Sequence, residues 1–328
     1  MTEPYISVII SVYNRTQYVG DAINSVLSQT LDKDKYEVLV ITNVDLPERD
    51  RVKIIKTNER WYGPMIAQAI EEARGEIISV LDDDDLFLPN KLEVIYKIFK
   101  ENNNVSLVRN PVKKVDMVGK ERLDPLPKEP ILLQPKNLNL DIIGEAITKY
   151  NLIFNNSSMS FRKEKILSYL DYLKKVKLSF DTFISLLFLF TNPIIIWNQY
   201  LSIYRVIMSS SSRDLTSLQQ YIERVSFHMR AIYDDLITLN EALKNSGYEE
   251  LFEKHLNYHK IVVKLWSKKS DVNVNLKDVF KAMPLNNPRI PRWRVFLLYM
   301  ASSLPYFLKK SIVYKRSYKK QLRVQNLL

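Results

Sequence analysis

The 328-residue sequence contains no cysteine, which excludes disulfide bonds and thiolate metal sites. This absence fits a reducing compartment. Histidine is almost as scarce: His228, His255 and His259 are the three in the sequence, all late in the chain. They cannot form a His-rich zinc site with the N-terminal half unless the fold brings the two parts together.

Long apolar runs are also missing. No uninterrupted stretch reaches the roughly 18–20 apolar residues that a membrane-spanning helix needs, and Glu3 stands where a secretory signal would carry basic residues. Acidic residues are absent from position 279 onward, where 11 Lys and Arg occur, whereas the rest of the chain holds 37 basic and 37 acidic residues. The net charge of +11 therefore belongs to the tail, residues 279–328. An apolar content of 46% excludes general disorder.

Strands and helices alternate through the first hundred residues. Apolar runs typical of strands buried on both faces occupy residues 5–13, 36–42, 52–57 and 76–81. Helical spacing follows the first strand. Helices that begin near a proline are predicted at 63–75, with Gly75 as the glycine that ends the helix, and at 89–100. This alternation predicts an α/β fold with an open, mostly parallel central sheet flanked by helices.

Polar residues follow three of the predicted strands. They are Asn14–Arg15, Thr42–Asn43 and the four consecutive aspartates Asp82–Asp85. Ligands of open α/β sheets bind outside the carboxyl ends of the strands, so we expect these loops to meet at one ligand-binding edge. Hard cations such as Mg²⁺ and Mn²⁺ prefer carboxylate oxygens, and the aspartate run offers them. The alternative is a helix-capping turn before Pro89, although an N-cap uses a single Asp.

The pattern loosens after residue 101. A proline- and charge-rich connection with a hairpin leads to a structured segment at 151–167, a buried helix at 179–190, and a strand or hairpin at 193–207. The serine-rich segment 208–217 predicts a boundary between a catalytic domain, residues 1–210, and a mainly helical C-terminal region, residues 211–328.

An ordered set of motifs resembles family 2 of the glycosyltransferases, which are enzymes of the GT-A fold, over about residues 4–210. In chain order the motifs are ISVIISVYNR (6–15), SVLSQT (25–30), EVLVI (37–41), AIEEARGEIISVLDDDD (69–85), SSMSFRK (157–163), SFD (179–181) and YR (204–205). The resemblance implies a Rossmann-like GT-A domain that moves a sugar from a nucleoside-diphosphate sugar to a hydroxyl acceptor, with inversion.

The resemblance also implies a donor site. By position, the nucleotide contacts are Ser11, Tyr13, Asn14 and Arg15, then Thr42 and Asn43. Family members carry aspartates where Thr42 and Asn43 stand, so this departure leaves the identity of the base open. An ordinary surface turn is the alternative for the second loop.

The aspartate run matches the family's D-x-D-D element. The match places Asp82 and Asp83 on the donor side, with exposure to solvent as the alternative for Asp83 at the variable position. It assigns a divalent cation, Mn²⁺ or Mg²⁺, to Asp84, with Asp85 as a second ligand or a supporting residue. Such a cation offsets charge on the departing diphosphate.

The resemblance places the general base and the acceptor side later in the chain. Asp181 occupies the position of the base, with an N-cap role as its alternative and Asp171 as a second candidate. Residues assigned to the acceptor or phosphate side are Asn156, Ser157, Ser158 and Arg205. Plain turn and strand-end roles remain open for these four residues.

The basic tail predicts contact with an anionic membrane surface through residues 290–325, because an apolar stretch lies beside clustered Lys and Arg. A lipid-linked or glycan acceptor would suit a cytoplasmic enzyme held at the inner face of the cell membrane. The alternative is packing on the catalytic domain or in a homodimer.

Three other classes of function remain as alternatives. A nucleotidyltransferase usually has a Gly-rich phosphate loop, but only Gly20 follows the first strand closely. A nucleic-acid-binding role is not expected, because carboxylates line the predicted ligand edge and repel phosphates. An inactive scaffold stays open because of Thr42 and Asn43.

Overall fold

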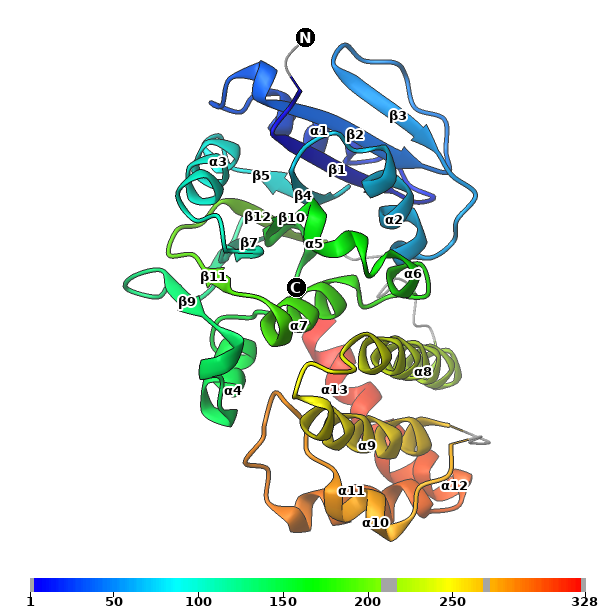
Figure 1. The fold of residues 1–328 in the computed structure, drawn as a ribbon. Coiled ribbons are helices and arrows are strands. Elements are labelled where there is room, and N and C mark those ends of the chain that lie inside the picture. The colour runs from blue at the N-terminus through cyan, green and yellow to red at the C-terminus, as the bar shows by residue number, and fades with distance from the viewer. Residues whose placement is uncertain (1–2, 208–216, 268–271, 326–328) are drawn as a thin grey trace. The chain divides into compact units, whose positions relative to one another are not determined.

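The computed structural model describes residues 3–207, 217–267 and 272–325. The chain divides into two compact units (Figure 1). The first contains residues 1–139 and 145–206, and the second contains residues 140–144 and 207–328. Most of the serine-rich segment predicted as a boundary, residues 208–216, lies outside the described residues.

An eight-stranded mixed sheet forms the centre of the first unit, with the strand order β3-β2-β1-β4-β10-β6-β11-β9 (Figure 1). The strands are β1 (Ile6–Val12), β2 (Tyr36–Thr42), β3 (Val52–Lys56), β4 (Ile77–Asp82), β6 (Leu107–Arg109), β9 (Ile131–Leu133), β10 (Met159–Arg162) and β11 (Ile194–Ile196). Strands β1 to β4 run parallel to one another, whereas β10 is antiparallel to its neighbours β4 and β6. The predicted α/β class and the four predicted N-terminal strands are confirmed.

Helices pack on this sheet because β1 is apolar on both faces. Every residue of β1 is buried, and alternate residues share a core with α1 (Val19–Leu27) and α3 (Lys91–Glu101). Helix α2 (Tyr62–Glu72) contacts β1 and β2 and ends before Gly75. Gly75 is therefore no helix cap: it packs so closely on β1 that an added Cβ would lie 2.5 Å from the amide nitrogen of Ser7.

A four-stranded second sheet has the order β5-β12-β7-β8. It contains β5 (Leu86–Phe87), β7 (Val112–Asp116), β8 (Glu121–Leu123) and β12 (Ser202–Val206). The hairpin expected in the connection after residue 101 is confirmed as β7 and β8. Residues 193–207 are neither one strand nor a hairpin, because β11 and β12 belong to different sheets.

Short helices connect the later strands of the first unit. They are α4 (Leu140–Thr148), whose first residues belong to the second unit, α5 (Lys163–Leu167), α6 (Leu170–Leu173) and the buried helix α7 (Phe180–Thr191). Single 3₁₀ turns occur at η1 (Lys33–Lys35), η2 (Pro135–Asn137) and η3 (Asn156–Ser158). Phe161 of β10 packs against Phe180 and Phe188, which holds α7 on the large sheet.

The second unit is mainly helical, as the sequence predicts. Its helices are α8 (Leu218–Ala242), α9 (Glu249–Trp266), α10 (Leu276–Lys281), α11 (Arg292–Ser303), α12 (Tyr306–Lys309), a π-helical turn η4 (Lys310–Tyr314) and α13 (Lys315–Gln325). Its core joins apolar residues of α9, α10 and α11. Across the described ranges, no helix has the length and apolar character needed to cross a bilayer.

Candidate functional site

The carboxyl ends of β1, β2 and β4 lie side by side at one edge of the large sheet. In the strand register Ser11 pairs with both Ile41 and Asp82. Just beyond these strands, the backbone N–H of Asn14 donates to Asn43 Oδ1 at 3.0 Å, and Asn43 Nδ2 donates to Asn14 Oδ1 at 2.6 Å. Asn14 adopts a left-handed backbone, with φ of 57°. The predicted strand-end residues are thus gathered at one edge.

Asp82 is half-buried, and its carboxylate is held by two donors. Tyr62 Oη donates to Asp82 Oδ1 at 2.6 Å, and Asn156 Nδ2 donates to the same carboxylate at 3.1 and 3.2 Å. Burial and the negative charge of Asp85 raise the pKa of Asp82, while the Tyr62 hydrogen bond opposes the rise. Asp82 is therefore a fixed acceptor at the edge of the sheet.

Arg15 binds the next two aspartates together. Its Nε donates to Asp83 at 2.9 and 3.0 Å, and its Nη2 pairs with both Asp83 and Asp84. Burial lowers the pKa of Arg15, but the hydrogen bonds and charges of the two carboxylates outweigh it and raise that pKa. Exposure of Asp83 to solvent, one of its two predicted roles, is wrong, because Asp83 is buried against Arg15.

Asp85 is fully buried and faces inward. It accepts hydrogen bonds from Ser157 Oγ at 2.6 Å, Asn155 Nδ2 at 2.7 Å and the backbone N–H of Arg205 at 3.0 Å. Burial and the charge of Asp84 raise its pKa to about 7, although the three donors lower it. This arrangement favours the supporting role of Asp85 over direct cation binding.

Asp181 lies in the first turn of α7. Its carboxylate accepts from the backbone N–H of Asn155 at 3.0 Å and from the N–H of Thr182 at 2.7 Å. Burial raises the pKa of Asp181, while these hydrogen bonds and the charge of Arg109 oppose the rise. The alternative N-cap role is wrong, because Ser179 occupies the N-cap position.

The turn η3 links the acidic loop to the rest of the site. Ser157 Oγ bonds Asp85 and also accepts the backbone N–H of Asp82 at 3.0 Å, while Ser158 Oγ donates to the carbonyl of Asn155 at 2.6 Å. Both serines are fully buried, whereas Asn156 is half-buried beside Asp82. The two serines therefore brace the loop, and Asn156 is the member of the turn that faces the site edge.

Three other predicted residues are placed as follows. Thr42 is buried, and its hydroxyl accepts the N–H of Val44 at 3.0 Å, so it shapes the loop after β2. Tyr13 is 39% exposed at the site edge. The guanidinium of Arg205 pairs with Asp21 at 2.9 Å, so its contact with the acidic loop is made by its backbone.

Lys91, at the start of α3, contacts the turn η3 with its side chain. Its side chain is fully buried, and its ammonium donates to Ser157 O at 2.7 Å, Ser202 Oγ at 3.0 Å and Asn110 Oδ1 at 3.2 Å. Burial, assisted by the charge of Arg109, lowers the pKa of Lys91 well below its usual range. The residue thus links η3 to β12 and to the connection between β6 and β7.

This buried lysine predicts a pH-dependent stability. Between its folded and its unfolded pKa, the unfolded chain binds more protons, so the free energy of unfolding rises with pH. We expect the free energy of unfolding of the wild type, relative to Lys91→Met, to increase with pH up to about pH 10, the ordinary pKa of lysine. Urea denaturation of both proteins across this range measures the effect, and a constant difference would contradict it.

Lys91, Arg109 and Asn155 belong to this cluster but are not predicted as site residues. Tyr62 also belongs to it; from the sequence, residues 61–63 either stack on a sugar or base or pack in the core, and the structure bonds the Tyr62 hydroxyl to Asp82. Lys91 and Arg109 are charged residues that the fold buries. The sequence does not show this burial, so it does not mark them as members of the site. Asn155 adjoins the predicted acceptor-side turn by one position.

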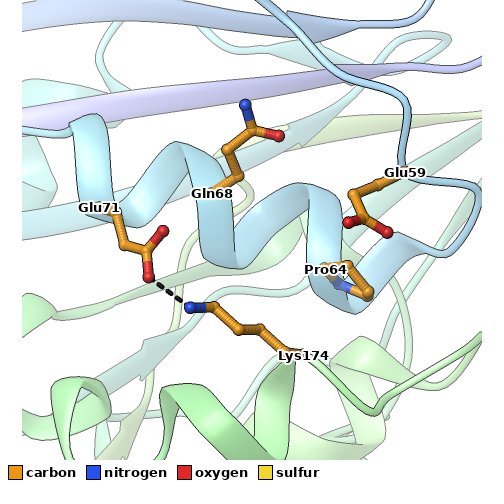
Figure 2. Close-up of a pocket in the computed structure, with 5 residues that line it drawn as sticks. All are labelled: Glu59, Pro64, Gln68, Glu71 and Lys174. Atoms are coloured by element: carbon orange, nitrogen blue, oxygen red, sulfur yellow. Dashed lines mark hydrogen bonds and ion pairs between the residues drawn. The ribbon is translucent and has the colours of Figure 1, made fainter.

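A surface cavity of about 380 Å³ opens beside α2 (Figure 2). It is lined by Glu59, Pro64, Gln68, Glu71 and Lys174, and Lys174 Nζ pairs with Glu71 Oε1 at 2.6 Å. None of these five residues belongs to the acidic cluster. The chemistry-bearing groups are therefore at the strand ends and not in this cavity.

The strand ends provide a partial cation site. Within residues 3–207, 217–267 and 272–325, no three acidic, cysteine or histidine side chains converge on one point. Asp84, half-buried and bound on one side by Arg15, and the edge carboxylate of Asp82 offer acidic oxygens. Such a donor set fits Mg²⁺ or Mn²⁺, which are often held by one or two carboxylates together with phosphates of a substrate.

The sheet order, the flanking helices and the acidic loop at a strand end define a glycosyltransferase of the GT-A type. The model of the family described as "Glycosyl transferase family 2" matches residues 7–170, which is half of the chain. The chain therefore belongs to glycosyltransferase family 2, as its motifs predict.

Curated relatives agree with this family. An uncharacterized glycosyltransferase of Methanocaldococcus jannaschii is 29% identical over 194 residues, covering 55% of this chain and 63% of that protein. An uncharacterized glycosyltransferase of Rickettsia bellii is 36% identical over 125 residues, covering 35% of this chain and 18% of that protein. The chain thus spans less than two thirds of the length of both relatives.

Solved structures share the fold. TarS residues 1–349 of S. aureus, in complex with UDP, has a TM-score of 0.53 and 13% identity, over 96% of this chain and 91% of that chain. The mannosyltransferase PcManGT from Pyrobaculum calidifontis, in complex with GDP-Man and Mn²⁺, has a TM-score of 0.53 and 14% identity, over 99% and 88%. The GT-A fold is therefore confirmed.

Proposed function

We propose that this protein is an inverting glycosyltransferase that moves a sugar from a nucleoside-diphosphate sugar to a hydroxyl of a glycan or lipid-linked acceptor. One observation carries the proposal: the acidic loop after β4 and Asp181 of α7 are bound to the same residue, Asn155. Carboxylates for a donor diphosphate with its cation and a carboxylate for a base are thus within reach of one small site.

The donor is placed at the ends of β1 and β2. Tyr13 is exposed there, and the paired amides of Asn14 and Asn43 offer hydrogen-bonding groups to a base edge or a ribose. Structures of similar fold support a nucleotide donor, since TarS is described in complex with UDP-GlcNAc and PcManGT with GDP-Man. Because a threonine and an asparagine replace the family's two aspartates in the second loop, uracil and guanine are both candidate bases.

Asp84 would hold the divalent cation, with the diphosphate completing its coordination and Asp85 supporting the loop. When bound, Mn²⁺ or Mg²⁺ supplies positive charge that offsets the negative charge on the departing diphosphate. Arg15 fixes the position of Asp84 for the cation, because its guanidinium lies against both Asp83 and Asp84. The Mn²⁺ named for PcManGT supports this assignment.

Asp181 acts as the general base. Its carboxylate takes the proton of the acceptor hydroxyl while that oxygen forms a bond to the anomeric carbon of the sugar. The bond from this carbon to the diphosphate oxygen breaks, and its electron pair leaves with the diphosphate, so the configuration inverts. Burial raises the pKa of Asp181, which makes it a stronger base than an exposed aspartate.

Donor turnover tests this proposal. The full chain is incubated with UDP-GlcNAc, GDP-mannose and related nucleotide sugars, with Mn²⁺, with Mg²⁺ and with EDTA, and released nucleoside diphosphate is measured. We expect metal-dependent release from at least one donor, because water can replace the acceptor slowly. The absence of release from every donor, together with the absence of donor binding, would contradict the proposed function.

We further propose that the second unit contacts an anionic membrane surface, as a peripheral protein of the inner face of the cell membrane. Helix α11 supports this, because four of its large apolar residues at helical spacing are exposed by 43% or more: Trp293, Phe296, Leu297 and Met300. Its opposite face, including Val295, is packed in the core of the second unit. Eleven basic residues and no acidic residue occur from position 279 onward, so the charge suits anionic lipid.

Vesicle binding tests the membrane contact. We expect the full chain to bind vesicles with anionic lipid, and the triple variant Trp293→Ser, Phe296→Ser, Met300→Ser to bind at least about 10-fold more weakly, because about 1.4 kcal/mol of lost apolar transfer suffices. The matched control changes three exposed apolar residues of the β7–β8 hairpin region, Met117, Val118 and Leu123, to serine. Equal loss in both variants, or a wild type that is a homodimer through α11 and does not bind vesicles, would contradict the contact.

A further inference from the structure

We propose that Asn155 is a positioning residue, which fixes the acidic loop and the base Asp181 relative to each other. This inference rests on the proposed function. Three different groups of this single residue make the contacts. Its side-chain Nδ2 donates to Asp85 Oδ2 at 2.7 Å, its backbone N–H donates to Asp181 Oδ2 at 3.0 Å, and its carbonyl accepts from Arg109 Nη1 at 2.7 Å. Loop, helix and strand β6 therefore meet at Asn155.

The backbone of Asn155 is adapted to this task. Its φ is 71° and its ψ is 115°, a positive-φ conformation beyond the αL well that glycine tolerates best. In this conformation the N–H points to Asp181 while the side chain reaches Asp85. A residue that cannot adopt this conformation would move the backbone N–H away from Asp181, even if its side chain could still bond Asp85.

The surroundings leave Asn155 little freedom. Its side chain is buried, with 6% of the residue exposed, and Ser158 Oγ also donates to its carbonyl at 2.6 Å. Arg109, which is almost fully buried, spans from Asn155 O to Asn151 O, so the segment before η3 is clamped at two points. Asn155 Oδ1 is buried without a hydrogen-bond partner among the described residues, so the amide is oriented by Asp85 alone.

The bond to Asp85 is made by the side chain of Asn155 and the bond to Asp181 by its backbone, so substitutions can remove one without the other. Asn155→Gly keeps the backbone conformation, and with it the N–H to Asp181, but removes the bond to Asp85. Asn155→Ala removes the same bond and also disfavours the left-handed backbone. Asn155→Asp keeps size and backbone tolerance, but it turns the donor toward Asp85 into an acceptor.

The experiment measures kcat and the donor KM for metal-dependent hydrolysis of UDP-GlcNAc or GDP-mannose, together with donor binding by calorimetry. We expect Asn155→Gly to raise the donor KM about 10-fold, the size of effect typical of residues that orient ligands, with little change in kcat. Asn155→Ala should raise KM similarly and also lower kcat about 10-fold or more, because Asp181 is displaced. Asn155→Asp should weaken donor binding at least as much as glycine does.

Asn245 supplies the matched control, because it has the same φ of 71° and lies in the second unit. Its glycine and alanine variants should change thermal stability alone. If the three Asn155 variants change stability but leave KM, kcat and donor binding per folded protein at wild-type values, Asn155 is structural only and the inference is overturned. A wild type that neither binds nor hydrolyses any donor overturns the proposed function instead, and this inference with it.

Discussion

Asp181→Asn is expected to lower sugar transfer about 10³-fold while donor affinity stays within about 2-fold of wild type, because a positioned general base contributes roughly 10²–10⁴-fold. The asparagine keeps the size of the side chain and one acceptor oxygen, which can bond the N–H of Asn155 or that of Thr182 but not both, so thermal unfolding is measured beside activity to check the fold. Donor turnover gives kcat, and calorimetry with nucleotide sugar and Mn²⁺ gives the affinity. The two readouts separate the chemical step from binding.

Asp171→Asn is the control for this variant, because Asp171 is an exposed aspartate of α6 and the second candidate for the base. It should retain wild-type kcat. Loss of donor binding together with transfer in Asp181→Asn would assign Asp181 a structural part, and loss of transfer in Asp171→Asn alone would move the base to α6.

Asp84→Ala is expected to abolish metal-dependent donor turnover, with a loss of at least about 10²-fold, because charge on the departing diphosphate is no longer offset. The fold should remain intact, since Asp84 is half-buried and Arg15 keeps its pairing with Asp83. Thermal unfolding checks the fold, and Mn²⁺ titration by calorimetry in the presence of donor checks the cation directly.

Asp34→Ala is the control for the cation assignment. Asp34 is an exposed aspartate of the turn η1, which precedes β2 and so lies at the opposite end of that strand from the candidate site. Its variant should turn over donor at the wild-type rate. Near-normal activity of Asp84→Ala would remove the cation from this residue.

The N-terminal half of the fold is predictable from sequence because its signals are local. Residues 36–42, predicted as a strand, form a strand with the same bounds, since an apolar β-branched run has few other stable structures. The error at Gly75 shows the limit: glycine after a helix usually caps it, but here close packing on β1 requires it. Residues 193–207 show the same limit, because sheet membership depends on distant partners.

Site residues that directly follow a predicted strand can be predicted from the sequence. Site residues whose role comes from their burial or their long-range contacts are harder to predict. The motifs lead to Asp82–Asp85 and Asp181, but not to the Arg15 bridge that buries Asp83. They name Asn156 to Ser158 and pass over Asn155, because its importance comes from a backbone conformation and three contacts between 26 and 70 positions away in sequence. Such contacts exist only once the chain is folded.

Thermal unfolding with a panel of nucleotide sugars, each with and without Mn²⁺, tests the central claim most directly. A ligand that binds only the folded state at 100 times its Kd stabilises it by about 2.7 kcal/mol. We predict that at least one nucleotide sugar raises the Tm of the wild type in the presence of Mn²⁺, and that the same donor fails to do so with Asp84→Ala. An unchanged wild-type Tm with every nucleotide sugar, at saturating metal, would contradict the account.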